Sequence, residues 1–316
     1  MGSLYGELRV FTGNAHPVLA ERICAYIGIP LGKAEVFEFS NENIFVRILE
    51  SVREDDVFVV QPICRPMNRS IMELLIMIDA LKRASAGRIT AVVPYYGYGR
   101  TDKKDQPRVP ITARLLADMI TVAGAHRVLT LDLHAGQIQG FFNIPVDELT
   151  AAFLLADYFR EKALPNLCVL SPDLGSAKRA RNVAALLDAP LAIIEKRRVG
   201  NTDRSEVLTV IGSVRGCHVL IVDDEIDTAN SITLAARAAI EHGALCVYAA
   251  CTHAVLSGPA LDRLAASPVR EVICSDTIPL PAGASSDLFT QLSVAPILGE
   301  TIQRIHTGTS VAFPHR

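Results

Sequence analysis

The segment VLIVDDEIDTANS, residues 219–231, contains the residues whose types and spacing point most directly to chemistry. Apolar residues run straight into Asp223 and Asp224, whose carboxylates can accept sugar hydroxyls or organise a metal ion. The small and polar residues of a candidate phosphate loop follow: Asp227, Thr228, Ala229, Asn230 and Ser231. We expect a helix to begin at about Ile232, because loop N–H groups and a helix N-terminus together bind phosphate. An Asp-rich helix cap is the alternative, and the paired acids favour the phosphate site.

Two further segments offer positive charge to a phosphorylated ligand. Arg100 ends the segment PYYGYGR, whose glycines let the backbone approach a ligand closely, and Thr101 and Asp102 follow it. Lys196 and Arg198 follow an apolar run and precede VGNTDRSE, a composition typical of a mobile loop. Charged stretches of this kind are more often solvated surface. The residues alone leave both interpretations open.

Other candidates are more isolated along the chain. Phe39, in FEFSNEN, can offer an aromatic face to a purine. The polar residues beside it can hydrogen-bond a nucleoside: Asn41, Glu42 and Asn43. His134 and Asp173 each follow a short apolar run. A lone His is more often structural than a ligand.

The elements that must position these residues show a regular rhythm. Short β-branched runs precede Gly, Asp or His at residues 8–11, 57–60, 89–93, 128–131, 169–170, 219–222, 247–250 and 272–273. Helical patterns lie between several of them, at 70–86, 111–123 and 150–159. This alternation predicts a doubly wound α/β fold with mainly parallel sheets. Acid-rich strand ends at 128–136 and 219–230 indicate two similar halves, with a boundary near 143–150.

Length and composition exclude several classes of protein. The 316 residues allow two domains of roughly 150 residues each. A net charge of −3 gives no global field for nucleic acid or an anionic membrane, so neither is an expected partner. The N-terminus MGSLYGELRV lacks a secretory pattern, and the apolar runs are of strand length. We therefore expect a cytoplasmic protein with reduced cysteines.

Taken together, the motifs resemble a known family. The phosphate loop is similar to that of phosphoribosyltransferases and ribose-phosphate pyrophosphokinases. The segments at 71–86, 93–117, 131–147, 170–180, 193–198, 251–260 and 275–280 resemble the second group, class I ribose-phosphate pyrophosphokinases. This resemblance implies two similar doubly wound domains of phosphoribosyltransferase type, at residues 1–147 and 148–316. It also implies that the last segment, from about residue 300, packs back on the first domain.

The resemblance implies an activity and a set of residue roles. The reaction is Mg²⁺-dependent transfer of the pyrophosphoryl group of ATP to the C1 hydroxyl of ribose 5-phosphate. Lys196 and Arg198 are assigned to catalysis, and His134 and Asp173 to the metal. ATP is assigned to Phe39, Asn41, Glu42, Asn43, Arg100, Thr101 and Asp102. Ribose 5-phosphate is assigned to Arg198, Asp223, Asp224, Asp227, Thr228, Ala229, Asn230 and Ser231. A homo-oligomer, a hexamer by family analogy, shares the ATP site between subunits.

Some residues depart from the family pattern at ligand-binding segments: Asn43, Arg69, Thr101, Ser176 and Asn230. Arg69 stands where the family has Asp, and Asn230 where it has Gly. A weakly active or inactive regulatory paralogue is therefore an alternative, although Lys196 and Arg198 are retained. A phosphoribosyltransferase is a weaker alternative, because the ATP-side segments match. A possible allosteric phosphate site matches Ser51, Arg53, Arg108 and Ser310.

Overall fold

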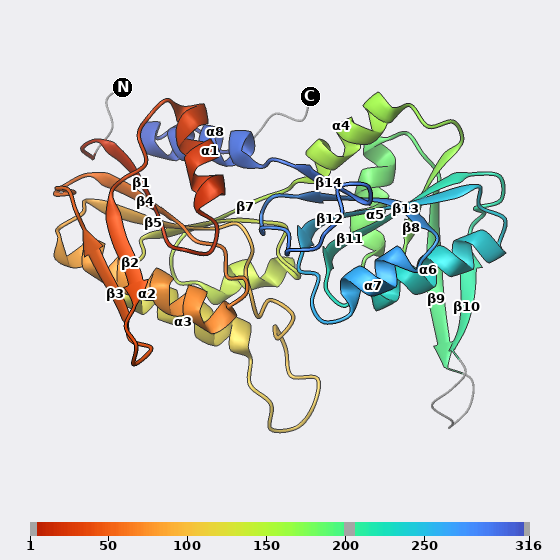
Figure 1. The fold of residues 1–316 in the computed structure, drawn as a ribbon, viewed down its shortest axis with the longest axis horizontal. Helices are drawn as coiled ribbons and strands as arrows, with labels where there is room; N and C mark the ends of the chain where they lie inside the picture. Colours follow the sequence, from red (N-terminus) through yellow and green to blue (C-terminus); the bar gives the residue numbers. More distant parts are fainter. Residues whose placement is uncertain (1–4, 199–205, 313–316) are drawn as a thin grey trace. The chain divides into compact units, whose positions relative to one another are not determined.

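The computed structural model describes residues 5–198 and 206–312, without the side chains of 196–198 and 206–208. The chain divides into two compact units (Figure 1). Unit 1 contains residues 5–149 and 293–312, and unit 2 contains the described residues between 150 and 292. The sequence placed the boundary after residue 147 and the start of the returning segment at about 300. The structure places them two residues later and seven residues earlier, respectively.

Unit 1 is built on a parallel sheet with the strand order β1-β4-β5-β6-β7. Its strands are β1 (Leu8–Thr12), β4 (Asp56–Val60), β5 (Arg88–Val93), β6 (Arg127–Leu131) and β7 (Val146–Leu149). The three central strands are almost wholly buried, which explains their continuous β-branched runs. β7 occupies the stretch in which the sequence suggested a domain boundary.

Helices cover both faces of this sheet. They are α1 (Pro17–Ile27), α2 (Met67–Arg83), α3 (Thr112–Ala123) and α8 (Ala295–Thr307), with the 3₁₀ turn η1 (Gly136–Phe141). α2 and α3 share a core with Val57 and Val59, whereas α1 lies beside α8 (Figure 1). A separate antiparallel hairpin, β2 (Ala34–Glu38) and β3 (Ile44–Ile48), packs against α2.

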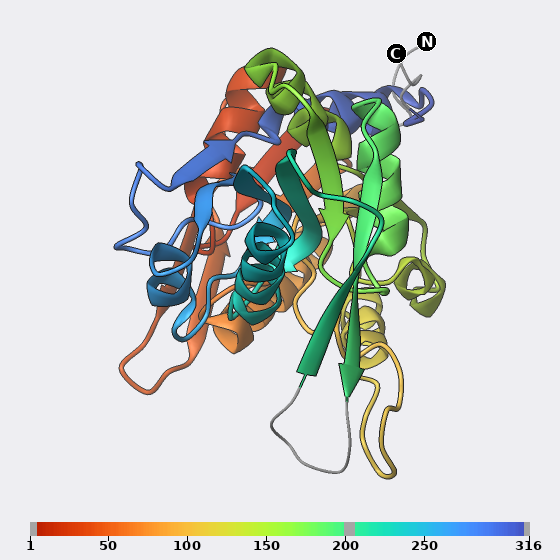
Figure 2. The same cartoon turned by 90° about the vertical axis from the view of Figure 1, so that its right-hand side faces the viewer.

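Unit 2 repeats the plan with a larger sheet in the order β10-β9-β8-β11-β12-β13-β14. Its strands are β8 (Leu167–Ser171), β9 (Leu191–Arg198), β10 (Glu206–Ile211), β11 (His218–Ile226), β12 (Cys246–Ala254), β13 (Val269–Ser275) and β14 (Phe289–Leu292). Among the strands that the structure describes in this unit, β10 alone runs antiparallel to its neighbour, and Figure 2 shows β9 and β10 as a long arm.

Helices cover both faces of the sheet of unit 2. They are α4 (Ala152–Lys162), α5 (Ala177–Leu186), α6 (Asn230–Glu241) and α7 (Ala260–Ala265). Leu220 and Val222 pack toward α4 and α5, whereas Val219 and Ile221 pack toward α6 and α7. Because neighbouring residues of a strand point to opposite faces, β11 is apolar on both sides. The predicted fold class, doubly wound α/β with mainly parallel sheets, is confirmed in both units.

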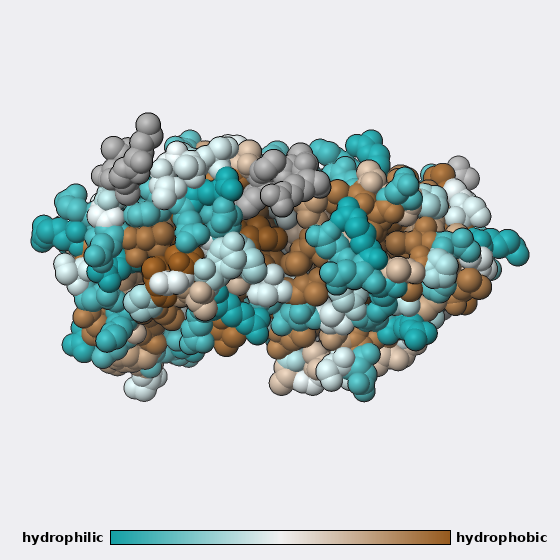
Figure 3. Space-filling view, turned by 90° about the horizontal axis from the view of Figure 1, so that it is seen from above, coloured by the Kyte–Doolittle hydropathy of each residue, from teal (hydrophilic) through white to brown (hydrophobic). Residues whose placement is uncertain are grey.

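The surface mixes polar and apolar side chains, as expected of a chain with 50% hydrophobic and 21% charged residues. On the face drawn in Figure 3, polar and apolar side chains are interspersed. Among the described residues, no helix combines the length and apolarity needed to cross a membrane. All of the cysteines are free, and five are buried: Cys24, Cys64, Cys168, Cys251 and Cys274. These five fill the core as small apolar residues.

Candidate active site

The paired acids lie inside strand β11 and not in the loop after it. Asp223 Oδ1 accepts hydrogen bonds from the Ser176 hydroxyl at 2.7 Å and from the backbone N–H of Asp224 at 2.9 Å. Arg179, on α5, places Nη1 3.0 Å from Asp224 Oδ1 and 4.0 Å from Asp223 Oδ1. β11 and α5 therefore bring two carboxylates and one guanidinium together at the carboxyl edge of the sheet.

Negative charge is concentrated at this edge. Burial raises the pKa of Asp223, and the adjoining carboxylates of Asp224 and Asp173 raise it further. The Ser176 hydroxyl acts in the opposite direction, because it donates to the ionised form. A bound cation or sugar hydroxyls would favour the ionised carboxylate. The oxygen donors fit a hard divalent cation such as Mg²⁺.

Asp173 is held in the loop that leads into α5. Its Oδ1 accepts the backbone N–H of Ser176 at 2.9 Å, and its carbonyl oxygen accepts the Ser171 hydroxyl at 2.6 Å. Ser176 thus connects Asp173 to Asp223. His134 belongs to unit 1, so the two residues assigned to the metal come from different units. Within the described residues, no group of three or more His, Cys, Asp or Glu side chains forms a ready metal site.

The candidate phosphate loop is shorter than the sequence suggested. α6 begins at Asn230, two residues before the predicted start at Ile232. Ala229 takes the left-handed conformation, with φ of 61°, whereas Asn230, which stands where the family has Gly, is helical. Asn230 and Ser231 lie in the first turn of α6, where N–H groups lack acceptors within the helix. Ala229 supplies no side-chain cap, which suits a helix end that binds an anion.

Contacts from the next strand and helix hold this turn. The Ser257 hydroxyl hydrogen-bonds Asp227 Oδ1, and the backbone N–H of Ser257 donates to the Asp227 carbonyl at 3.0 Å. Arg263 Nη1 donates to the carbonyl of Thr228 at 3.0 Å. Sequence reasoning missed the supporting residues Ser257 and Arg263. Ser257 could have been found from its position just after an apolar run, because that run forms β12, the neighbour of β11. Arg263 has no comparable signal in the sequence.

Unit 1 brings its own candidate residues together around His134. A Cβ atom on Gly99 would lie 3.5 Å from Cβ of His134, so the loop that carries Arg100 passes close to this histidine. Asp102 is buried and accepts a hydrogen bond from Gln137 Nε2 at 2.9 Å. Arg100 and His134 are exposed, whereas Thr101 is half-buried. Two segments distant in sequence therefore form one polar surface.

The residues expected at adenine form the tip of the β2–β3 hairpin. Phe39 is 48% exposed, and its ring centroid lies 5.0 Å from that of Phe37 and 5.9 Å from that of Phe45. Asn41 Oδ1 accepts the backbone N–H of Asn43 at 3.2 Å. Glu42 has a φ of 67°, as expected of a tight turn. The tip presents an aromatic face and amide groups to the surroundings.

Lys196 and Arg198 lie near the end of β9, paired with Leu208 and Glu206 of β10. Their side chains lie outside the described part of the structure. The residues proposed for the allosteric site are exposed on unit 1: Ser51, Arg53, Arg108 and Ser310.

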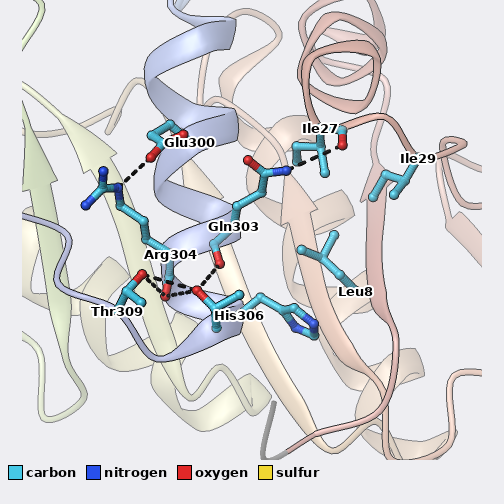
Figure 4. Close-up of a pocket in the computed structure, with 9 residues that line it drawn as sticks. Leu8, Ile27, Ile29, Glu300, Gln303, Arg304, His306 and Thr309 are labelled. Carbon is cyan, nitrogen blue, oxygen red and sulfur yellow. Dashed lines mark hydrogen bonds and ion pairs between the residues drawn. The ribbon is translucent and has the colours of Figure 1, made fainter. Parts of the chain in front are cut away.

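A pocket of about 600 Å³ lies elsewhere on unit 1, between α8 and the segments around Leu8 and Ile27 (Figure 4). Gln303 and His306 are among its lining residues. Leu8 begins β1, whereas His134 follows the end of β6. Since these strands run parallel in one sheet, the pocket lies near the amino ends of the strands and His134 near their carboxyl ends. The pocket is therefore not part of the candidate site.

Comparison with known proteins gives a consistent family assignment. Residues 8–124 match the family model of the N-terminal domain of ribose phosphate pyrophosphokinase, and residues 199–316 match the phosphoribosyl synthetase-associated domain. A ribose-phosphate pyrophosphokinase from Caldanaerobacter subterraneus subsp. tengcongensis is 54% identical over 313 residues, covering 99% of both chains. One from Clostridium perfringens is 55% identical over 303 residues, covering 95% of both.

A solved structure agrees with these relatives. The phosphoribosylpyrophosphate synthetase from Mycobacterium smegmatis superimposes with a TM-score of 0.89 at 43% identity, over 95% of this chain and 99% of that one. These proteins all carry the enzyme's name, and the alternative of a regulatory paralogue finds no support among them. The chain belongs to the ribose-phosphate pyrophosphokinase family.

Proposed function

We propose that this chain transfers the pyrophosphoryl group of ATP to the C1 hydroxyl of ribose 5-phosphate, with Mg²⁺ bound. The observation that carries the proposal is the acidic end of β11 running through a short turn into the N-terminus of α6. Such an edge matches a phosphorylated sugar, because carboxylates accept hydroxyl groups and helix N–H groups bind phosphate. Family membership supports the choice of reaction.

On the sugar side, each group has a distinct task. Asp223 and Asp224 accept hydrogen bonds from the ribose hydroxyls. The turn and the first residues of α6 bind the 5-phosphate: Asp227, Thr228, Ala229, Asn230 and Ser231. Ser257 keeps Asp227 in place, so the turn is formed before the ligand arrives.

On the nucleotide side, the hairpin tip binds adenine through Phe39, Asn41, Glu42 and Asn43. Arg100, Thr101 and Asp102 belong to the same ATP site, in which the Arg100 guanidinium faces the phosphates. Asp173 and His134 are the residues that we assign to Mg²⁺, which when bound would neutralise charge along the triphosphate.

The transfer itself is one in-line displacement. The C1 oxygen of ribose 5-phosphate forms a bond to the β-phosphorus, and the bond from that phosphorus to the oxygen bridging to the α-phosphorus breaks, so AMP leaves. The C1 hydroxyl proton is released. Lys196 and Arg198 stabilise the charge that develops between the α- and β-phosphates, and Arg198 also contacts the sugar phosphate.

The proposal includes an assembly and a location. The chain forms a homo-oligomer in which the hairpin tip completes the ATP site of a neighbouring copy, and it works in the cytoplasm. Light scattering after size-exclusion chromatography tests the assembly, and a monomer at assay concentration contradicts a shared site.

The proposal also includes regulation. Phosphate regulates the enzyme through Ser51, Arg53, Arg108 and Ser310.

The test of function is formation of AMP and phosphoribosyl pyrophosphate from ATP and ribose 5-phosphate with Mg²⁺ and phosphate. We expect turnover in the wild type and a loss of at least about a hundredfold in Lys196→Ala. Lys82→Ala, which removes an exposed lysine at the end of α2, is the charge-matched control. A folded wild type that binds nucleotide without producing AMP would contradict the proposal and favour the regulatory paralogue.

A further inference from the structure

Glu73, on α2, is a buried carboxylate that joins three segments of unit 1. Its side chain is 2% exposed. Oε1 accepts hydrogen bonds from Asn14 Nδ2 at 2.9 Å and from Arg69 Nε at 3.1 Å. Oε2 accepts the backbone N–H of Asn14 and Gln61 Nε2, both at 2.9 Å. Because a buried charge is costly unless it is paired and hydrogen-bonded, this set of donors fixes the positions of the groups around it.

Two members of this network also contact strand β2. Arg69 Nε lies 3.4 Å from Glu38 Oε2, and Glu38 is the last residue of β2, directly before Phe39. Asn14 Nδ2 donates to the carbonyl of Val36 at 3.1 Å. We call this set the Glu73 network: Asn14, Glu38, Gln61, Arg69 and Glu73. It contacts β2 at two positions two residues apart, on the strand that leads to the hairpin tip.

The hairpin needs an external support of this kind. It forms a two-stranded sheet of its own and does not join the five-stranded sheet of unit 1. An isolated two-stranded hairpin is only marginally stable, so its orientation depends on what it packs against. Val36 and Val46 pack on the core beneath it, whereas Phe39 and residues 41–43 are exposed at the tip. Apolar packing supports the base of the hairpin, and the Glu73 network supports the end of β2 nearest the tip.

We propose that the Glu73 network positions the hairpin tip for nucleotide binding, with Arg69 as the bridge between the buried carboxylate and β2. Arg69 is a positioning residue and does not itself touch the nucleotide. The inference rests on the proposed function, in which Phe39 binds adenine. It also gives a role to a departure from the family pattern, since an Asp at position 69 would place a third carboxylate beside Glu38 and Glu73.

The test compares two methionine substitutions on one helix. Arg69→Met keeps the aliphatic stem but removes the bridge to Glu38. Arg83→Met is the matched control, because Arg83 pairs with Asp79 one turn earlier on α2, with Nε 2.6 Å from Oδ2, in an exposed pair. We expect Arg69→Met to raise the KM for ATP about three- to tenfold, with the kcat and the KM for ribose 5-phosphate within twofold of wild type. Arg83→Met should leave all three unchanged.

Hydrogen exchange reports on the hairpin directly. The backbone N–H of Phe39 donates to the Asn43 carbonyl at 2.9 Å, and that of Glu42 to the Phe39 carbonyl at 2.8 Å. These amides should exchange faster in Arg69→Met than in wild type or Arg83→Met. Unchanged exchange with an unchanged KM for ATP would overturn the inference, as would an equal rise in KM for both substrates.

Phe39→Ala separates this inference from the proposed function. A raised KM for ATP in Phe39→Ala but not in Arg69→Met means that the tip binds nucleotide and the network does not position it. An unchanged KM for ATP in Phe39→Ala means that the assignment of adenine to the tip is itself wrong. A double-mutant cycle of Arg69→Met with Glu38→Gln completes the test. Non-additive changes in KM support action through Glu38, and additive ones contradict it.

Discussion

Ala229 is the residue that most changes the interpretation of the phosphate loop. It takes a left-handed backbone conformation directly before α6, with φ of 61° and 3% exposure. Residues with a Cβ atom reach this conformation only at a cost, because Cβ approaches a backbone oxygen. The sequence comparison drew attention to Asn230, but Asn230 is helical. Any strain in the turn therefore resides one residue earlier.

Glycine at these two positions should have opposite effects. Ala229→Gly removes the strain and should raise the free energy of unfolding by about 1 kcal/mol. Asn230→Gly places glycine in the first turn of a helix and should lower it by about 0.5 kcal/mol. Urea unfolding of both variants beside wild type measures the difference. Equal stabilisation by the two substitutions would contradict the conformation assigned to Ala229.

A substitution at Ser257 tests whether the support of Asp227 matters for ribose 5-phosphate binding. Its hydroxyl and its backbone N–H both bind Asp227, so Ser257→Ala removes one hydrogen bond from the Asp227 carboxylate. We expect the KM for ribose 5-phosphate to rise about threefold to tenfold, with the KM for ATP unchanged. Ser267→Ala is the control, because that hydroxyl caps α7 by donating to the Leu264 carbonyl at 2.7 Å. A rise in the KM for ATP alone would count against the role of Asp227.

Among the elements, α4 is joined to the distant strand β13 by a polar cluster. Lys162 Nζ lies 2.6 Å from Glu271 Oε2, and the Tyr158 hydroxyl bonds the other carboxylate oxygen. Thr290, on β14, donates to the same carboxylate at 2.7 Å. Burial opposes the ionisation of Glu271, but the hydrogen bonds from Lys162, Tyr158 and Thr290 outweigh it and lower its pKa. The cluster thus connects a helix and two strands.

Replacing this carboxylate should have an effect that depends on pH. A lowered pKa means that the unfolded chain binds a proton more readily than the folded one. The stabilisation is therefore fully present above the ordinary glutamate pKa of 4.5 and is lost as the pH falls through the lowered value. Glu271→Gln should lower the free energy of unfolding by about 1–2 kcal/mol at pH 7, and by less at acidic pH. Urea unfolding at several pH values measures this, with the exposed Glu161→Gln on α4 as control. A constant difference across pH would show that ionisation is not the cause.

After unit 2, the chain returns to unit 1 and forms α8 there, so unit 1 is built from both ends of the sequence. Asp56 is fully buried and accepts hydrogen bonds from Arg88 Nε and Nη2, at 2.8 and 2.6 Å. His306 Nδ1 lies 3.0 Å from the same carboxylate, and Arg88 also donates to the carbonyl of Ile305. Leu298 and Ile302 of α8 are fully buried as well. The C-terminal helix is therefore an integral part of unit 1.

Truncation after Leu292 should accordingly destabilise unit 1, although most of unit 1 lies in the first half of the sequence. Removal of α8 uncovers α1 and leaves Asp56 without His306, whereas every described element of unit 2 is retained. We expect hydrogen exchange to become fast in α1 and to stay slow in α6. A chain ending at Ala312 is the control, since it keeps α8. Persistent protection of α1 in the shorter chain would show that unit 1 folds without the helix.

The sequence alone determined a great deal about this protein. Alternating apolar runs and helical patterns predicted the parallel strands, because burial on both faces demands continuous β-branched residues. The runs at 57–60 and 219–222 are examples, and both lie within observed strands. The acidic segment at 223–231 marked the candidate sugar site, because few other structures explain paired aspartates before a helix. The hairpin at β2–β3 was missed, because a short pair of strands outside the main sheet has little periodicity of its own.

Only the tertiary structure decided which groups meet. Ser176 with Asp223, Ser257 with Asp227 and Arg69 with Glu38 are 47, 30 and 31 residues apart in sequence, and no local pattern encodes such pairings. The same holds for α8, whose polar partners include Asp56 on β4 and Arg88 on β5, more than 200 residues earlier in the sequence. Local propensity fixes where a strand or helix forms, whereas long-range packing fixes the contacts that position its ends. Residue types thus led to a chemical hypothesis for the site, whereas the contacts that support its residues came only from the tertiary structure.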